Sequence, residues 1–261
     1  TLGVYNYKKP TADNFCCTQM KWQIGCSGFY YKEWKDFFYP KGLPQKNWFK
    51  FYCENFNTIE INASFYKMPS VKSLNKWYNE SPDDFSFTMK APRLITHYKK
   101  LKDCEEDLYE FYKIVNEGLQ GKLACILFQF PPSFSFSSER LDSLVELLAS
   151  VPSQNVVEFR HASWWNETVY RKLTSNKITF AGQSYPANLP EELIKTGPTL
   201  YYRFHGKPIL YKSQYELSVL ETFIENLPAE ITETFVYFNN TWGASAIVNA
   251  QQLIQLVKAN N

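Results

Sequence analysis

Residues 123–148 read LACILFQFPPSFSFSSERLDSLVELL, and this stretch decides the fold class. Residues 123–129 are almost continuously apolar, which is typical of a strand buried on both faces of a parallel sheet. Leucine and valine then recur at helical spacing from about Ser138 to Leu148. A buried strand followed by an amphipathic helix forms one βα unit, so the sequence predicts a parallel α/β protein.

The same strand-then-helix pattern recurs along the chain. The predicted strands span residues 22–25, 57–62, 85–90, 123–129, 155–160, 177–182, 199–205 and 233–238. Strict alternation of strands and helices over about 240 residues matches the size of a (β/α)8 barrel. We therefore expect one α/β domain, a single (β/α)8 TIM-type barrel over residues 22–261, after an irregular leader at residues 1–21.

Local signals mark several helix ends, since short polar side chains can accept hydrogen bonds from a helix's first backbone N–H groups. The predicted caps are Ser70 and Asn166, with capping boxes at Asp103 with Glu106 and at Ser213 with Glu216. A short helix is expected near residues 191–195.

An open dinucleotide-binding sheet is the main competing α/β architecture. Its first strand is followed by a loop with three glycines and, at once, a helix. The corresponding residues here, Gly25-Cys26-Ser27-Gly28, lack the third glycine and the helix. The sequence therefore favours the barrel.

Composition and charge limit the kinds of partner that we expect the protein to bind. The net charge is +2, which gives no global attraction to nucleic acid or membrane. Residues 1–100 nevertheless hold 15 Lys and Arg against 8 Asp and Glu, a pattern of either a solvated face or a patch for an anionic ligand. No apolar run approaches the roughly 18 residues of a membrane span. None of the six cysteines has C-x-x-C spacing, and we expect a cytoplasmic protein without membrane contact.

Polar side chains end the predicted strands, and in such barrels the active site lies at these carboxyl ends. They are Ser27, Glu60, Asn62, Lys90, Gln129, Glu158, Arg160, His161, Gln183, Arg203, His205, Asn239 and Asn240. A charged group at the end of an apolar strand is costly to desolvate unless it is paired or used. The convergence predicts a functional site. The alternative is a polar plug of ion pairs, such as Glu60 with Lys90 and Glu158 with Arg203.

Residue chemistry suggests roles within this site. Glu60 and Glu158 are the predicted general acid and base. Lys90 is either an anchor for an anionic group or a desolvated amine. His161 and His205 are candidate proton carriers, with metal ligation as the alternative. The predicted substrate-binding residues are Ser27, Asn62, Tyr66, Gln129, Arg160, His161, Trp164, Arg203, Asn239 and Asn240.

No cofactor and no metal ligand are predicted, although a divalent metal stays open as an alternative. Such a site needs several Asp, Glu and His at adjacent strand ends, and strands six and eight end here in neutral groups. Aromatic residues crowd the same loops, where they either stack on a ring of the ligand or roof the barrel. They are Phe29, Tyr30, Tyr31, Trp34, Phe65, Tyr66, Trp164 and Trp165.

Six ordered motifs resemble the DUF72 family, also called YecE-like or UPF0759. They are IGCSG at 24–28, FNTIEIN at 56–62 with SFY at 64–66, FQFPP at 128–132, EFRH at 158–161 with SW at 163–164, YRFHG at 202–206 and YFNN at 237–240. The resemblance spans about residues 22–257 and implies a TIM barrel, but the family's activity is not established, so it implies no reaction. Family members often carry Asp where this chain has Gln183-Ser184 and Thr241.

Three functions follow as hypotheses. The first is an enzyme acting by acid/base chemistry, hydrolysis or proton transfer, on a small polyhydroxylated or anionic substrate. The second is a nucleic-acid-binding or processing protein that uses the basic, aromatic-rich first third, including Tyr30, Trp34 and Lys35. The third is a non-catalytic ligand-binding barrel. The sequence does not indicate an oligomeric state.

Overall fold

The structure is a computed structural model, and it describes residues 20–151 and 153–260. The predicted leader lies outside the described residues apart from Met20 and Lys21, and Lys21 already belongs to the first strand.

In the part of the chain that the structure describes, nine parallel strand segments form two sheets. The segments are β1 (Lys21–Cys26), β2 (Thr58–Ile61), β3 (Ser86–Lys90), β4 (Leu123–Gln129), β5 (Asn155–Glu158), β6 (Thr179–Phe180), β7 (Gly182–Ser184), β8 (Thr199–Phe204) and β9 (Glu233–Phe238). One sheet has the order β1-β9-β8-β7 and the other β2-β3-β4-β5-β6. All eight predicted strands are therefore present, with the sixth divided into β6 and β7.

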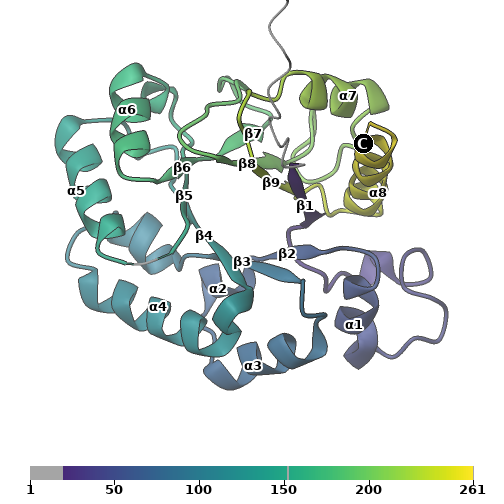
Figure 1. Ribbon diagram of the computed structural model, residues 1–261. Helices are drawn as coiled ribbons and strands as arrows, with labels where there is room; N and C mark the ends of the chain where they lie inside the picture. The colour runs from purple at the N-terminus through teal and green to yellow at the C-terminus, as the bar shows by residue number, and fades with distance from the viewer. Residues whose placement is uncertain (1–19, 152, 261) are drawn as a thin grey trace, which may run out of the picture.

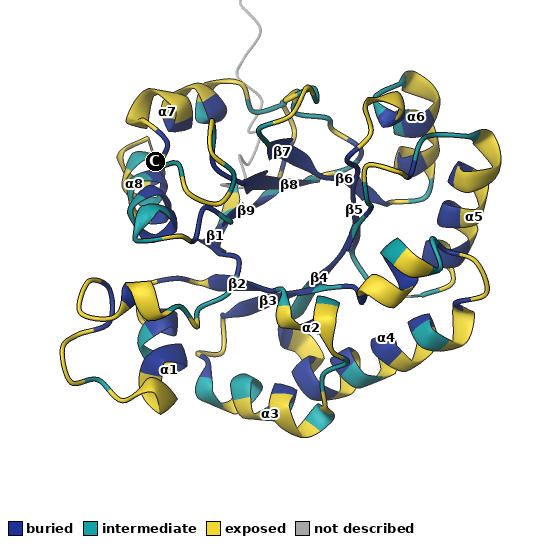
Figure 2. Cartoon of the chain, turned by 180° about the vertical axis from the view of Figure 1, so that it is seen from behind, coloured by how far each residue is buried: buried dark blue, intermediate teal, exposed yellow. Residues whose placement is uncertain are grey.

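The two sheets together make a TIM-type ring. The chain passes from β6 to β7 through the single residue Ala181, and an isolated parallel bridge between Ser27 and Glu60 brings the end of β1 beside β2. Figures 1 and 2 show the strands encircling a common centre with the helices outside them. The predicted fold class is confirmed.

Eight α-helices lie in the described part of the chain. They are α1 (Trp48–Cys53), α2 (Ala63–Tyr66), α3 (Val71–Glu80), α4 (Glu105–Leu119), α5 (Ser138–Ala149), α6 (Glu167–Ser175), α7 (Leu217–Glu225) and α8 (Ser245–Ala259). Ser70 accepts a hydrogen bond from the backbone N–H of Ser73, and Asn166 accepts one from Val169, so both predicted caps are confirmed. None of the described helices is long and apolar enough to cross a membrane.

Both predicted capping boxes are wrong. Asp103 takes a positive φ of 47°, and α4 begins two residues later, after Cys104, without a side-chain cap. Ser213 accepts a hydrogen bond from the backbone N–H of Ile209 instead, and α7 follows Glu216. In both cases a turn comes before the helix, so the predicted cap residue does not lie directly before the first helical residue.

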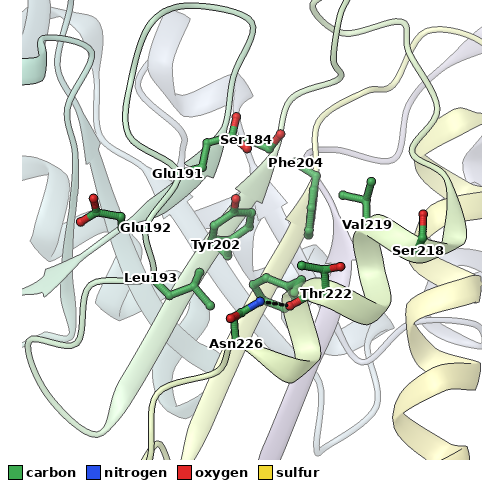
Figure 3. A pocket seen from close by; sticks show the side chains of 11 residues that line it. Ser184, Glu191, Glu192, Leu193, Tyr202, Phe204, Ser218, Val219, Thr222 and Asn226 are labelled. Atoms are coloured by element: carbon green, nitrogen blue, oxygen red, sulfur yellow. Dashed lines mark hydrogen bonds between the residues drawn. The ribbon is translucent and has the colours of Figure 1, made fainter.

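The predicted helix at residues 191–195 is also wrong, because the described residues 185–198 contain neither helix nor strand. One barrel strand position therefore lacks its covering helix, and the strict alternation of strands and helices breaks there. A cavity of about 560 Å3 lies in this region, against Tyr202 and Phe204 of β8 and Val219 of α7 (Figure 3).

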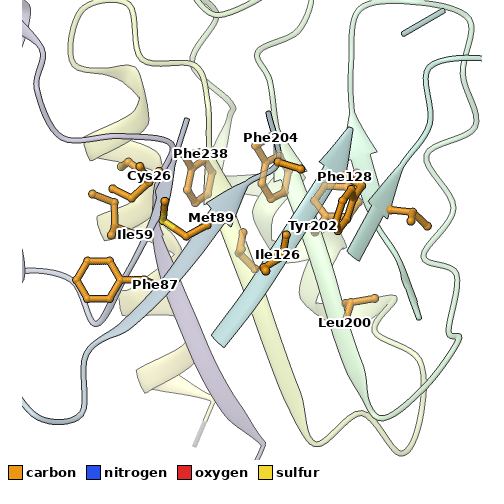
Figure 4. Close-up of a cluster of buried hydrophobic side chains, with 14 of the residues drawn as sticks. Cys26, Ile59, Phe87, Met89, Ile126, Phe128, Leu200, Tyr202, Phe204 and Phe238 are labelled. Atoms are coloured by element: carbon orange, nitrogen blue, oxygen red, sulfur yellow. The ribbon is translucent and has the colours of Figure 1, made fainter. Parts of the chain in front are cut away.

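The apolar core has two parts, because successive side chains of a strand point to opposite faces. The larger part fills the layer between strands and helices and includes Phe87, Phe128 and Phe238 (Figure 4). The smaller part includes Leu127, Val156 and Phe235. Above these residues, the carboxyl ends of the strands carry polar groups.

Candidate active site

An ion network lies inside the barrel at the carboxyl ends of the strands. Nη2 of Arg203 lies 2.7 Å from Oε1 of Glu60, and its Nη1 lies 3.0 Å from Oε2 of Glu158. All three side chains are at most 1% exposed. Burial by itself lowers the pKa of Arg203, but the two carboxylates outweigh it and raise that pKa. Arg203 therefore stays charged between them.

Glu60 has further hydrogen-bond donors. Ser27 Oγ donates to its Oε1 at 2.6 Å, and the Tyr201 hydroxyl donates to its Oε2 at 2.5 Å. Tyr201 was missed by the sequence reasoning. The signal was available, since residues 201, 203 and 205 share one face of an alternating strand.

Glu158 is held as a carboxylate. Arg160 Nη2 lies 2.6 Å from its Oε1, and His205 Nε2 lies 3.4 Å from its Oε2. Burial alone raises the pKa of Glu158, but Arg160 and Arg203 overcome burial and hold that pKa well below its usual range. Glu158 therefore carries its negative charge at neutral pH.

His205 is neutral for a related reason. Burial, then the two arginines, lower its pKa well below the usual value. Arg160 Nη2 donates a hydrogen bond to Nε2 at 2.8 Å. The other ring nitrogen, Nδ1, lies 3.0 Å from the side-chain amide of Asn239.

Arg160 has unused hydrogen-bonding capacity. Its guanidinium group lies 3.8 Å over the ring of Tyr185, which is a cation–π contact. Its Nη1 is buried and has no hydrogen-bond partner among the described residues. A buried arginine donor without a partner costs free energy, so this atom is a candidate contact for a bound anion.

Lys90 differs from the arginines because no carboxylate lies in contact with it in the described part of the chain. Its Nζ donates to Oε1 of Gln129 at 3.0 Å and lies 4.2 Å from the ring centroid of Phe65. Burial, followed by the nearby Arg203, lowers the pKa of Lys90 to about 7. Of the two ion pairs expected for a polar plug, only Glu158 with Arg203 is present.

Four predicted substrate-binding residues make no hydrogen bond or ion pair with this network among the described residues. His161 is exposed and accepts a hydrogen bond from the backbone of Ser163, so it caps a short turn. Trp164 is completely buried and stacks on Phe159 at 4.0 Å. Tyr66 is 68% exposed.

Asn240 is the fourth of these residues. It is fully buried, and its amide donates to Ser213 and to Asn249 of α8. Trp34, one of the aromatic residues expected at the mouth, is also completely buried. The buried side chains of Trp34, Trp164 and Asn240 therefore belong to the packing around the site.

The described residues hold no group of three or more His, Cys, Asp and Glu side chains that could bind a metal ion. Glu60 and Glu158, the two carboxylates nearest the centre, already have Arg203 between them.

Comparison with known proteins agrees with the fold. The family model "Protein of unknown function DUF72" matches residues 23–261. UPF0759 protein YunF of Bacillus subtilis is 26% identical, in an alignment that covers 85% of this chain and 90% of YunF. UPF0759 protein YecE of Escherichia coli is 28% identical over 116 residues, 44% of this chain and 42% of YecE.

Solved structures give the same result. The crystal structure of a DUF72 family protein from Thermotoga maritima matches with a TM-score of 0.83 and 33% identity, covering 91% of this chain and 99% of that one. D-psicose 3-epimerase from Clostridium cellulolyticum matches with a TM-score of 0.53 and 12% identity, covering 92% of this chain and 99% of that one. At this identity, the match shows a likeness of fold alone. The family model and the Thermotoga relative together show that this chain belongs to the DUF72 family, also called UPF0759.

Proposed function

We propose that the protein is an enzyme that moves a proton on a small anionic substrate at the carboxyl end of the barrel. Lys90 exchanges the proton, and Arg160 binds the negatively charged group. The observation that carries this proposal is a pair of cations in different environments. Among the described residues, a buried donor of Arg160 has no hydrogen-bond partner, and Lys90 donates to the neutral side chain of Gln129.

Lys90 is suited to proton transfer because of its pKa. A general acid or base works best when its pKa lies near the working pH, and the pKa of Lys90 is about 7. A lysine in water, with a pKa of about 10.4, holds its proton too tightly for this role. The desolvated amine therefore gives both a protonated and an unprotonated form near neutrality.

Arg160 is suited to anion binding because its guanidinium group is positioned before the ligand arrives. Glu158 and Tyr185 hold it from two sides, which leaves Nη1 for the ligand. Under this proposal, Glu60 and Glu158 keep the arginines in place and do not exchange protons themselves. Glu60 already accepts three hydrogen bonds, and Glu158 keeps its charge because of the arginines.

The anion site can be tested with inorganic phosphate and succinate as probes, measured by the rise in melting temperature. We expect the Arg160→Met variant to bind these probes about tenfold or more weakly, because it loses charge-assisted hydrogen bonds. Arg171→Met is the matched control, since Arg171 lies exposed on α6. Equal binding by wild type and Arg160→Met would show that Arg160 does not hold the anion.

The reaction can be tested by incubating the protein in deuterium oxide with a pooled set of hydroxy acids, keto acids and sugar phosphates. Mass spectrometry then finds any compound that gains deuterium or is consumed. We expect Lys90→Met to abolish the reaction, while Lys72→Met, at an exposed position on α3, leaves it unchanged. No reaction by the wild type, or full reaction by Lys90→Met, would refute the assignment and leave the ligand-binding barrel as the better hypothesis.

Nucleic-acid binding is the second candidate, and one observation favours it. The Arg93 guanidinium lies 5.7 Å from the ring centroid of Tyr66 and 5.4 Å from that of Tyr98, and both tyrosines are well exposed. Exposed rings beside a cation are a common platform for stacked bases. Binding of labelled single-stranded DNA that weakens steeply with salt, and that Arg93→Met reduces, would support this candidate.

A further inference from the structure

We propose that a pocket beside Asn62 binds a planar ring that donates one N–H or O–H group. The ring would be the part of the substrate farther from Lys90, and this assignment of substrate class rests on the proposed function. It adds an aromatic or heteroaromatic portion to the anionic group expected at Arg160.

The pocket lies between the loop after β1 and the residues that follow β2. Its volume is about 340 Å3, within the range of small-molecule sites. Four aromatic side chains line it, namely Phe29, Tyr30, Tyr31 and Trp77.

The aromatic walls keep part of their ring surface exposed in the pocket. Phe29, Tyr31 and Trp77 are only partly buried, and the rings of Phe29 and Trp77 meet edge to face at 6.0 Å. Apolar ring surface facing an open pocket gains free energy when a ligand covers it, and flat rings pack well against other rings. The walls therefore favour a flat, mostly apolar ligand.

Asn62 supplies the polar part of recognition. Its Oδ1 is buried and has no hydrogen-bond partner among the described residues. The three side-chain hydroxyl groups that line the pocket, those of Ser27, Tyr30 and Tyr31, are already hydrogen-bonded. The Tyr31 hydroxyl donates to the backbone carbonyl of Ser27 at 2.6 Å, and Ser27 Oγ donates to Glu60. Among the described residues that line the pocket, Asn62 Oδ1 is thus a buried side-chain acceptor without a partner, which favours a ligand with a donor in the plane of its ring.

The pocket adjoins the charge network through Ser27, which lines the pocket and donates to Glu60 Oε1 at 2.6 Å. Gly28 has a positive φ of 99°, and a Cβ at this position would lie 3.0 Å from the Tyr31 hydroxyl. Its conformation lets the loop turn back so that Tyr31 reaches Ser27. A ring in this pocket would thus lie beside the proposed reaction centre.

The test uses indole, 1-methylindole and benzofuran as probes, titrated against 15N-labelled protein. The three rings have nearly the same shape, but only indole carries an N–H donor. We expect indole to bind at least about fivefold tighter than the other two, because Oδ1 of Asn62 gains a partner only from indole. The shifted resonances should include those of residues 28–31 and 62.

Variants of Asn62 make the test specific. Asn62→Ala should bind indole no tighter than 1-methylindole, whereas Asn62→Asp, which keeps an acceptor, should retain the preference for indole. Asn79→Ala, exposed on α3, is the matched control and should bind all three rings like the wild type. Equal affinity for indole and 1-methylindole in the wild type, or an unchanged preference in a folded Asn62→Ala variant, would overturn the proposal.

Failure of this inference is distinguishable from failure of the proposed function. Lys90→Met should leave indole binding intact while it abolishes deuterium exchange. Indole selectivity without any exchange reaction would retain the ring pocket and reject the proton-transfer role. An exchange reaction without indole selectivity would reject the ring pocket and retain the proton-transfer role of Lys90.

Discussion

Lys90 and Arg203 are cations inside the same barrel, and their different partners give them opposite properties. Arg203 lies between two carboxylates, which raise its pKa against the effect of burial. Lys90 has a neutral amide as its partner, and burial with Arg203 lowers its pKa to about 7. Arg203 therefore keeps its positive charge, whereas the charge of Lys90 changes near neutral pH.

Lys90 should make the stability of the protein depend on pH. Its pKa is lowered in the folded state, so between pH 7 and about 10.4 the unfolded chain binds more protons at this position. The free energy of unfolding should therefore gain a rising contribution from Lys90 between pH 7 and 9. Urea unfolding at several pH values would measure it as the difference from Lys90→Met. A constant difference across this range would mean that the pKa of Lys90 is not lowered.

At the scale of elements, the packing of β1 against β2 depends on one glycine. A Cβ at Gly25 would lie 2.2 Å from the backbone oxygen of Thr58 and 2.8 Å from the Tyr52 hydroxyl. No side chain fits at that distance, so any larger residue has to push β1 away from β2. This contact adjoins the Ser27–Glu60 bridge that joins the two sheets.

Gly25→Ala should therefore destabilise the protein by about 1–3 kcal/mol or more, the usual cost of overpacking a rigid site. The midpoint of urea unfolding would show the loss. Gly121→Ala is the control, since a Cβ there meets no atom within 4 Å. Equal stability of Gly25→Ala and Gly121→Ala would mean that β1 and β2 are not packed this closely.

At the scale of the whole molecule, Arg203 links the two sheets across the barrel. Arg203 belongs to β8 in one sheet, whereas Glu60 and Glu158 belong to β2 and β5 in the other. Tyr237 of β9 makes a similar link, with its hydroxyl 2.6 Å from Thr58 and 2.9 Å from Thr88. Polar contacts between the two sheets thus add to the apolar packing of residues such as Leu127, Val156 and Phe235.

Arg203→Met should cost about 3–5 kcal/mol, because it leaves buried negative charge without compensation. Adding Glu60→Gln should recover part of this loss, since the remaining Glu158 and Arg160 pair is electrically balanced. Urea unfolding of the two single variants and the double variant gives the coupling energy. A double variant less stable than Arg203→Met would contradict the view that unpaired charge is the main cost.

The sequence by itself determined the class of fold, the positions of the strands and the identity of the polar residues at their ends. These features are local, since an apolar run or a helical period is readable within one segment. It also placed the caps at Ser70 and Asn166 correctly. It failed at the helix expected near 191–195 and at both capping boxes, where a turn or an irregular segment replaces the regular element.

Only the tertiary structure decided which of these residues meet. Arg203 and Glu60 are 143 residues apart in sequence, and nothing local indicates that Arg203 takes both carboxylates and leaves Lys90 with Gln129. Likewise, Trp164 and Asn240 lie next to strand ends in sequence but pack into the surrounding layers. The physical reason is that pairing and desolvation depend on distances across the barrel, which are fixed only when all eight strand positions assemble.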